Sequence, residues 1–171
     1  RHPLPEVAAF AARLSACGVD AGTQVVAYDN EGGIFASRLW WMLRWLGHDK
    51  VAVLDGGLAG WKRSKRALEE TVPVVAPHNF VAQPRELAVD TAEVVAGLGS
   101  RSALILDARS PERFRGENET LDPVGGHIPG AVNRFFRDNL DAGGHFRPAI
   151  DLRREFLALL AGIDPAQVVM S

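Results

Sequence analysis

Short apolar segments alternate with helical patterns along the whole chain, and this alternation limits the possible folds more than any other feature. Four runs have the length and composition of buried strands, over residues 24–28, 51–54, 103–106 and 168–171. The spacing of apolar residues predicts helices between them, over residues 5–16, 34–46, 91–98 and 150–161, and a short helix bearing Trp61. Strands that alternate with helices form parallel sheets with helices on their faces. The sequence therefore predicts the α/β class.

One of these expected strands is followed directly by a cluster of charged residues. The apolar run that ends at Leu106 is followed by Asp107, Arg109 and Arg113. Ligands bind at the carboxyl ends of parallel strands in open α/β sheets, although an isolated Asp-Arg pair is as often a surface ion pair that contributes little. Residues 126–133, GHIPGAVN, then form a turn that leads into another apolar run. This second block favours a ligand site.

These two blocks resemble the rhodanese (sulfurtransferase) family, whose members have an aspartate-x-arginine strand end followed by GHIPGA. A further block, VLDGGLAGW over residues 53–61, is similar to the family's VLDGGxxxW. Because the VLDGG block belongs late in a rhodanese domain and GHIPGA early in one, their order implies two consecutive modules, both incomplete here. Each module would be a parallel sheet flanked by helices. We expect the C-terminal portion of a first module over residues 1–66, a proline-spaced linker over 67–89 and the N-terminal portion of a second module over 90–171.

The resemblance also implies where the nucleophile lies. In the family, the strand that corresponds to residues 168–171 runs into a loop that begins with the catalytic cysteine. We therefore expect that cysteine just after Ser171, and no nucleophile or sulfurtransferase activity in this chain alone. In the first module Asp29 stands where the family has cysteine, which implies a non-catalytic module that supports the second.

Three charged residues of the second module match the family's site. Sulfur donors such as thiosulfate and 3-mercaptopyruvate are anions, and guanidinium groups suit such ligands because they offer forked donors. Arg113 stands at the family position that contacts the donor, so we expect it to bind substrate. Asp107 is expected to orient the site through an ion pair with Arg109, and Arg109 is a second candidate for substrate contact.

The function implied by the resemblance is sulfur transfer from an anionic donor, through a cysteine persulfide, to cyanide or another thiophilic acceptor. We expect thiosulfate as the donor, because relatives that prefer 3-mercaptopyruvate often have a further arginine before GHIPGA, and residues 116–126 contain none. 3-Mercaptopyruvate is the alternative donor. An inactive rhodanese module with a binding or regulatory role is the alternative from another class, and a phosphatase-like enzyme is a more remote one.

Composition argues against several other classes of protein. A net charge of -2 argues against a general nucleic-acid binder or a membrane-surface protein, and no apolar run approaches the length of a transmembrane span. The histidines show no metal-ligand spacing, so we expect no metal and no cofactor. Cys17 is the single cysteine, which is typical of a reducing compartment, and we expect a cytoplasmic protein.

Three further residues or segments invite functional roles that we do not assign to them. Cys17 lies at the end of the first expected helix, where the helix dipole disfavours a thiolate, and we interpret it as a buried small apolar residue. His127 is interpreted as a hydrogen-bonding residue of the turn, because an ionised thiolate needs no general base. The loop over residues 29–33 lacks the lysine and the glycine spacing of a phosphate-binding loop.

Overall fold

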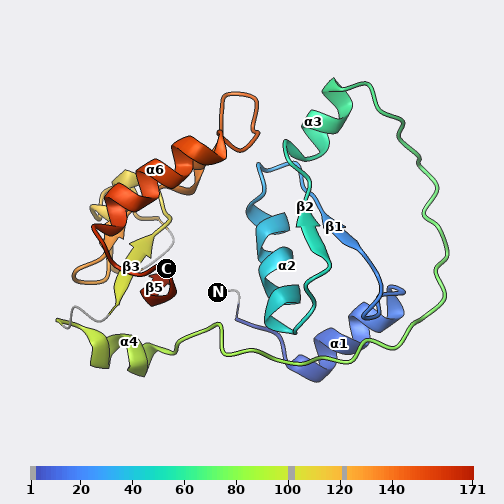
Figure 1. Ribbon diagram of the computed structural model, residues 1–171, viewed down its shortest axis with the longest axis horizontal. Coiled ribbons are helices and arrows are strands. Elements are labelled where there is room, and N and C mark those ends of the chain that lie inside the picture. Colours follow the sequence, from blue (N-terminus) through green and yellow to red (C-terminus); the bar gives the residue numbers. More distant parts are fainter. Residues whose placement is uncertain (1–2, 100–102, 121–122) are drawn as a thin grey trace. The chain divides into compact units, whose positions relative to one another are not determined.

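The chain forms two compact units, each with its own parallel sheet, as the computed structural model in Figure 1 shows. The structure describes residues 3–99, 103–120 and 123–171. The first unit comprises Arg1–Leu87 and the second Ala88–Ser171. The parallel sheets agree with the predicted α/β class. Within the described ranges, no helix is both long and apolar enough to cross a membrane.

The first unit is built on one strand–helix–strand crossover. β1 (Val25–Ala27) and β2 (Val51–Val53) pair in parallel, with Val25 opposite Val51, and α2 (Ile34–Trp45) connects them and packs against both. α1 (Val7–Ala16) precedes the crossover and α3 (Gly57–Arg63) follows it. Parallel strands need such a helical crossover, since a tight turn can join only antiparallel strands. The expected strands and helices of this half are all present, one or two residues shorter than predicted at some ends.

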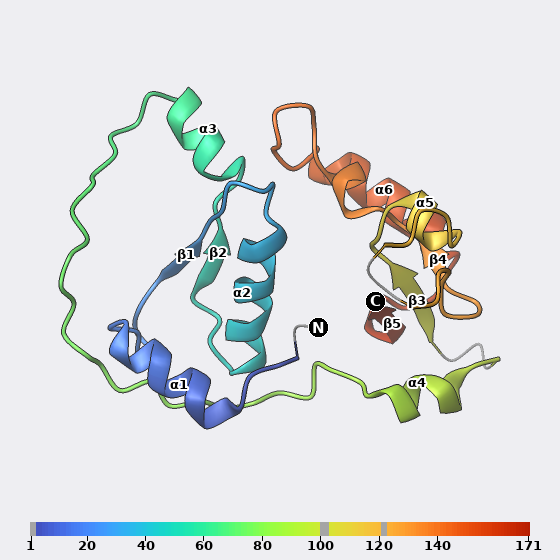
Figure 2. The same ribbon diagram turned by 180° about the vertical axis from the view of Figure 1, so that it is seen from behind.

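The core of the first unit includes a residue of the extended stretch that follows α3. The buried side chains that pack together are Leu14, Val19, Leu43, Leu46 and Phe80. Phe80 belongs to the extended stretch after α3, which both Figures 1 and 2 show running back alongside α1. Its backbone N–H donates to the Ser15 hydroxyl at 3.0 Å. This stretch therefore contributes to the packing of the first unit.

Other contacts fix the same stretch to the first unit. The Gln83 N–H donates to the Leu46 carbonyl at 2.9 Å, and the Arg85 guanidinium donates to both Asp49 carboxylate oxygens at 2.8 and 2.7 Å. Residues 67–89, expected as a linker, are thus extended, but their part from His78 to Arg85 is packed on the first unit.

The second unit has a three-stranded parallel sheet of order β4–β3–β5. Its elements are α4 (Thr91–Gly97), β3 (Leu104–Asp107), α5 (Pro111–Phe114), β4 (Val132–Asn133), η1 (Phe136–Asn139), α6 (Ala149–Leu160), η2 (Pro165–Gln167) and β5 (Val168–Met170). Because all three strands are parallel, their carboxyl ends meet at one edge. The short α5, η1 and η2 were not predicted.

Candidate active site

The site of the second unit begins where β3 and β5 end side by side. Asp107 is the last residue of β3, and Ser171 follows β5 directly. The Ser171 N–H donates to the Leu106 carbonyl at 2.9 Å, and the Ala108 N–H donates to the Ser171 carbonyl at 3.1 Å. These two bonds continue the parallel ladder past the strand ends. They hold Ser171 next to the Asp107 turn.

Asp107 is a buried carboxylate paired with Arg109. Its side chain is 1% exposed. One oxygen accepts from the Arg109 backbone N–H at 2.9 Å and from Nε at 3.0 Å, and the other accepts from Nη2 at 2.6 Å. Burial by itself raises the pKa of Asp107, but the bonds from Arg109 outweigh it and the pKa lies below its usual value. The structure therefore contains the ion pair between Asp107 and Arg109.

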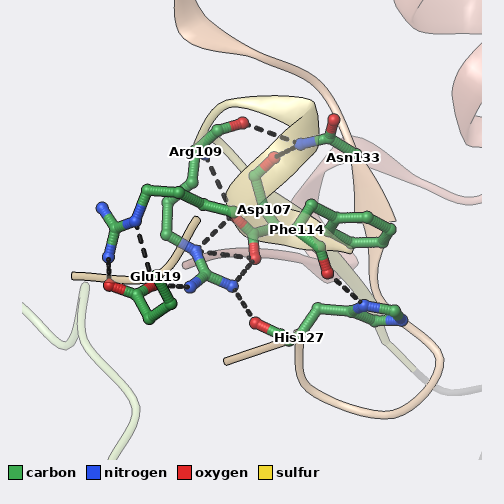
Figure 3. Close-up of polar contacts among 8 residues, drawn as sticks. Asp107, Arg109, Phe114, Glu119, His127 and Asn133 are labelled. Carbon is green, nitrogen blue, oxygen red and sulfur yellow. Dashed lines mark hydrogen bonds and ion pairs between the residues drawn. The ribbon is translucent and has the colours of Figure 1, made fainter. Parts of the chain in front are cut away.

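The same turn is tied to the GHIPGA segment. Arg109 Nη2 also donates to the Gly126 carbonyl at 2.6 Å. The Asn133 side-chain amide donates to the Asp107 carbonyl at 3.0 Å and to the Arg109 carbonyl at 2.9 Å (Figure 3). Two segments that are distant in the sequence are thereby locked together around Arg109. The role of Asn133 is not among the expectations from the sequence, although this residue stands at the end of the expected apolar run.

Arg113 comes from α5 and is paired with Glu119, an acidic residue that no motif in the sequence marks. Its Nε and Nη2 donate to the two Glu119 oxygens at 3.0 and 3.2 Å. The Glu119 side chain is 5% exposed and also lies 3.9 Å from Arg109 Nη1. Nothing in the sequence distinguishes Glu119 from Glu117, which pairs with Arg115 in solvent.

His127 is a hydrogen-bonding residue of the GHIPGA turn, as interpreted from the sequence, and its partner is in α5. Its Nδ1 lies 2.7 Å from the Phe114 carbonyl, which can only accept, so Nδ1 carries the proton. The His127 ring also stacks on the Phe114 ring, with the centroids 3.8 Å apart and the planes at 10°. Both contacts connect the GHIPGA turn to α5.

A hollow opens at this edge of the sheet. Its lining residues are Arg109, Val124, Gly125, Gly126, His127, Ile128 and Ser171. Among the described residues, the lining therefore includes Arg109 and the end of the chain, but not Arg113. A guanidinium beside peptide groups suits a small anionic ligand. The described residues contain no group of three or more His, Cys, Asp or Glu side chains that could hold a metal ion.

In the first unit, the loop after β1 encloses the Asp29 carboxylate. One oxygen accepts from the N–H groups of Glu31 and Gly33 at 2.9 and 2.8 Å. The other accepts from Phe35 and Ala36, at the start of α2, both at 2.9 Å. Burial raises the pKa of Asp29, but the four bonds together lower it below its usual value. The loop binds an anion, and that anion is its own side chain.

The interpretation of Cys17 as a buried residue is wrong. The thiol is free and exposed. α1 ends at Ala16, and the chain turns at Gly18 with φ of +73°. Because of this turn, Val19 enters the core in place of Cys17, with 8% of its surface exposed.

Comparison with known proteins agrees with these features. The family model described as a rhodanese-like domain matches residues 2–64. Over 164 residues the chain is 48% identical to a probable 3-mercaptopyruvate sulfurtransferase of Pseudomonas aeruginosa, covering 95% of this chain and 58% of the relative. The chain belongs to the rhodanese family.

Other rhodanese relatives differ in the donor that their names state. A putative thiosulfate sulfurtransferase, SseB of Mycobacterium tuberculosis, is 37% identical, with 78% of this chain and 48% of the relative covered. The crystal structure of SseA from Escherichia coli, described as a 3-mercaptopyruvate sulfotransferase with the rhodanese fold, matches with a TM-score of 0.78 and 32% identity. That match covers 95% of this chain and 61% of SseA. The chain thus spans about half the length of the curated relatives that it matches.

Proposed function

We propose that the intact protein is a 3-mercaptopyruvate sulfurtransferase whose nucleophile is a cysteine just after Ser171. The observation that carries this proposal is the hollow at the ends of β3 and β5, where Arg109 and Ser171 both line the wall. A residue that follows Ser171 at this edge would enter the hollow beside a fixed cation. Such a position suits a thiolate, because nearby cations and backbone N–H groups lower a thiol pKa.

The proposed reaction has two steps. The cysteine thiolate attacks the sulfur atom of 3-mercaptopyruvate, the carbon–sulfur bond breaks, and its electron pair leaves as the enolate of pyruvate, which takes up a proton. The enzyme then carries a persulfide. Cyanide or another thiophile attacks the outer sulfur, the sulfur–sulfur bond breaks, and the thiolate is regenerated as thiocyanate leaves. Arg109 and Arg113 would attract and hold the donor carboxylate.

Thiosulfate is the second candidate donor. The sequence alone favoured it, because residues 116–126 contain no arginine, and one relative bears that name. The P. aeruginosa relative and the E. coli structure are both named for 3-mercaptopyruvate. They are the reason that we place this donor first.

We also propose that the chain contains parts of two rhodanese modules, residues 1–66 and 90–171, connected by residues 67–89. In the first, Asp29 occupies the loop that would otherwise hold the cysteine, and its carboxylate accepts all four of the loop and helix N–H groups described above. This module would be non-catalytic. The second module would carry the reaction.

The donor is tested with the intact protein. We expect pyruvate to form from 3-mercaptopyruvate with cyanide as acceptor, at a higher kcat/KM than thiocyanate formation from thiosulfate. Mass spectrometry after donor treatment without acceptor should show one added sulfur atom on the residue after Ser171, and replacing this cysteine with serine should abolish both. A residue other than cysteine at this position, together with no turnover of either donor, would overturn the proposal in favour of an inactive binding module.

A further inference from the structure

Glu119 is a buried carboxylate between two guanidinium groups. Its side chain is 5% exposed, whereas those of Arg109 and Arg113 are 26% and 28% exposed. It accepts from the Nε and Nη2 edge of Arg113 at 3.0 and 3.2 Å and lies 3.9 Å from Arg109 Nη1. Figure 3 shows it directly beside the Asp107–Arg109 pair. The site thus contains alternating charges in the order Asp107, Arg109, Glu119 and Arg113.

This arrangement means that each cation has an acidic partner before a donor enters. Asp107 pairs with Arg109, and Glu119 pairs with Arg113. The positive potential in the hollow is therefore weaker than two arginines alone would produce. The attraction of a donor depends on that potential multiplied by the donor's own charge.

We infer that Glu119 is a specificity-determining residue, which limits the positive potential of the hollow so that a donor with one negative charge is favoured over a donor with two. The inference rests on the proposed function, because it concerns the choice between its two candidate donors. 3-Mercaptopyruvate has one carboxylate and, near neutral pH, a thiol that is largely protonated, since ordinary thiols have a pKa of about 8.5. Thiosulfate is a dianion.

Removing the negative charge of Glu119 makes the net charge of the site more positive by one unit. The added attraction is twice as large for a dianion as for a monoanion. With effective dielectric constants of about 30–50, which lie between those of a protein surface and water, and separations of about 8–10 Å, the difference corresponds to roughly threefold to tenfold in relative kcat/KM. A stronger positive potential would also lower the pKa of the attacking thiol, but that change affects both donors and cancels in their ratio.

Glu117 provides a matched control. It lies in the same loop and pairs with Arg115, but both side chains are 53% exposed. Water and salt screen exposed charges strongly. Glu117→Gln therefore makes the same change in net charge without placing that change beside Arg109.

The test measures kcat/KM for thiosulfate and for 3-mercaptopyruvate on the same preparation of the intact protein at low ionic strength. We expect Glu119→Gln to raise the thiosulfate-to-mercaptopyruvate ratio roughly threefold to tenfold. Glu119→Asp, which keeps the charge, and Glu117→Gln should leave the ratio within about twofold. The ratio does not depend on how much of a preparation is folded. If the glutamine variant gives no folded protein, Glu119→Ala removes the same charge with a smaller side chain.

Added salt gives a second measurement. Screening should return the ratio of the neutral variant toward that of the wild type. An unchanged ratio in the neutral variants, or an equal shift in Glu119→Asp, would overturn the inference, because Glu119 would then act by shape or by positioning Arg113. Absence of turnover of both donors by the wild type would instead overturn the proposed function.

Discussion

At the scale of single residues, Asp29 has an environment made of backbone N–H groups that suits a carboxylate. Its carboxylate accepts N–H groups from Glu31, Gly33, Phe35 and Ala36, all within 2.8–2.9 Å. Two of these donors belong to the unpaired first turn of α2, where negative charge is favourable. The carboxylate therefore stabilises both the loop and the start of the helix. The position requires a negatively charged side chain, because four N–H groups donate to it.

Asp29→Asn is expected to lower the free energy of unfolding of the first unit by about 1–3 kcal/mol at neutral pH. The amide nitrogen would face backbone N–H groups with hydrogens of its own. The pKa of Asp29 is lowered in the folded state from an ordinary value of 3.8, so the stabilisation is fully present above that value and is lost as the pH falls through the folded pKa. The difference between wild type and variant should shrink below about pH 4.

Tryptophan fluorescence during urea unfolding measures this effect in the first unit alone, because that unit contains all four tryptophans, Trp40, Trp41, Trp45 and Trp61. Glu31→Gln makes the same change in charge in the same loop, and its exposed side chain accepts none of these bonds. It should cost less than about 0.5 kcal/mol. Equal losses in the two variants would mean that the enclosed carboxylate is unimportant.

At the scale of elements, the turn between β2 and α3 fits tightly against the Asp29 loop. Gly57 has φ of +56°, and a Cβ added there would lie 2.7 Å from the Asp29 carbonyl oxygen. The Leu58 N–H donates to that same oxygen at 3.1 Å. Gly57, the second glycine of the VLDGG motif, is therefore required for two reasons. Its backbone is left-handed, and the Asp29 carbonyl leaves no room for a Cβ.

Gly57→Ala should lower the free energy of unfolding of the first unit by about 2–4 kcal/mol, since left-handed strain and a backbone clash act together. Gly33 separates the two causes. Its φ is +93°, but an added Cβ would meet no atom within 4 Å, so Gly33→Ala should cost only the conformational part, about 1–2 kcal/mol. The urea midpoint followed by tryptophan fluorescence compares them. If Gly57→Ala lowers the free energy of unfolding no more than Gly33→Ala does, the predicted clash with the Asp29 carbonyl is wrong.

The longer elements could be predicted from the sequence because their signals are local. The run that ends at Leu106 and the run from Val168 are short, apolar and bounded by turn residues, and both became strands of one sheet. α5 has four residues and η2 three, too few to show a helical period. The presence of α5 depends on the turn that follows β3, and that of η2 depends on the path of the chain into β5.

The candidate site was predictable in its residue types and less so in its contacts. The aspartate-x-arginine pair is set by adjacent residues, and it formed. Arg113 was expected to bind a donor, and in the structure Glu119 occupies one edge of its guanidinium. That pairing depends on the path of the chain after α5, which no spacing rule predicts. For the same reason, the burial of Glu119 could not be inferred from the pattern. The exposure of Cys17 has another cause, because it depends on the turn at Gly18 that directs Val19 into the core.

At the scale of the whole molecule, the extended stretch that follows α3 in the first unit has two parts with different properties. From about Leu68 to Val75 the apolar side chains are exposed, Val72 at 85% and Val74 completely. Phe80, a few residues later, is 7% exposed and belongs to the core of the first unit. The first part is accessible along its backbone. The second is held by a buried ring and by the Arg85–Asp49 ion pair.

Brief digestion with thermolysin, which cleaves before large apolar residues, should therefore cut first at Val72 and Val74 and spare Phe80. Phe80→Ala removes the buried ring, should cost about 3–4 kcal/mol in the first unit, and should extend cleavage to residues 78–85. Val74→Ala is the matched control, because its side chain is fully exposed, and it should leave that region protected. Early cleavage before Phe80 in the wild type would mean that residues 78–85 detach readily from the first unit. Cleavage within residues 78–85 in Phe80→Ala but not in Val74→Ala would show that the buried ring holds this stretch on the first unit.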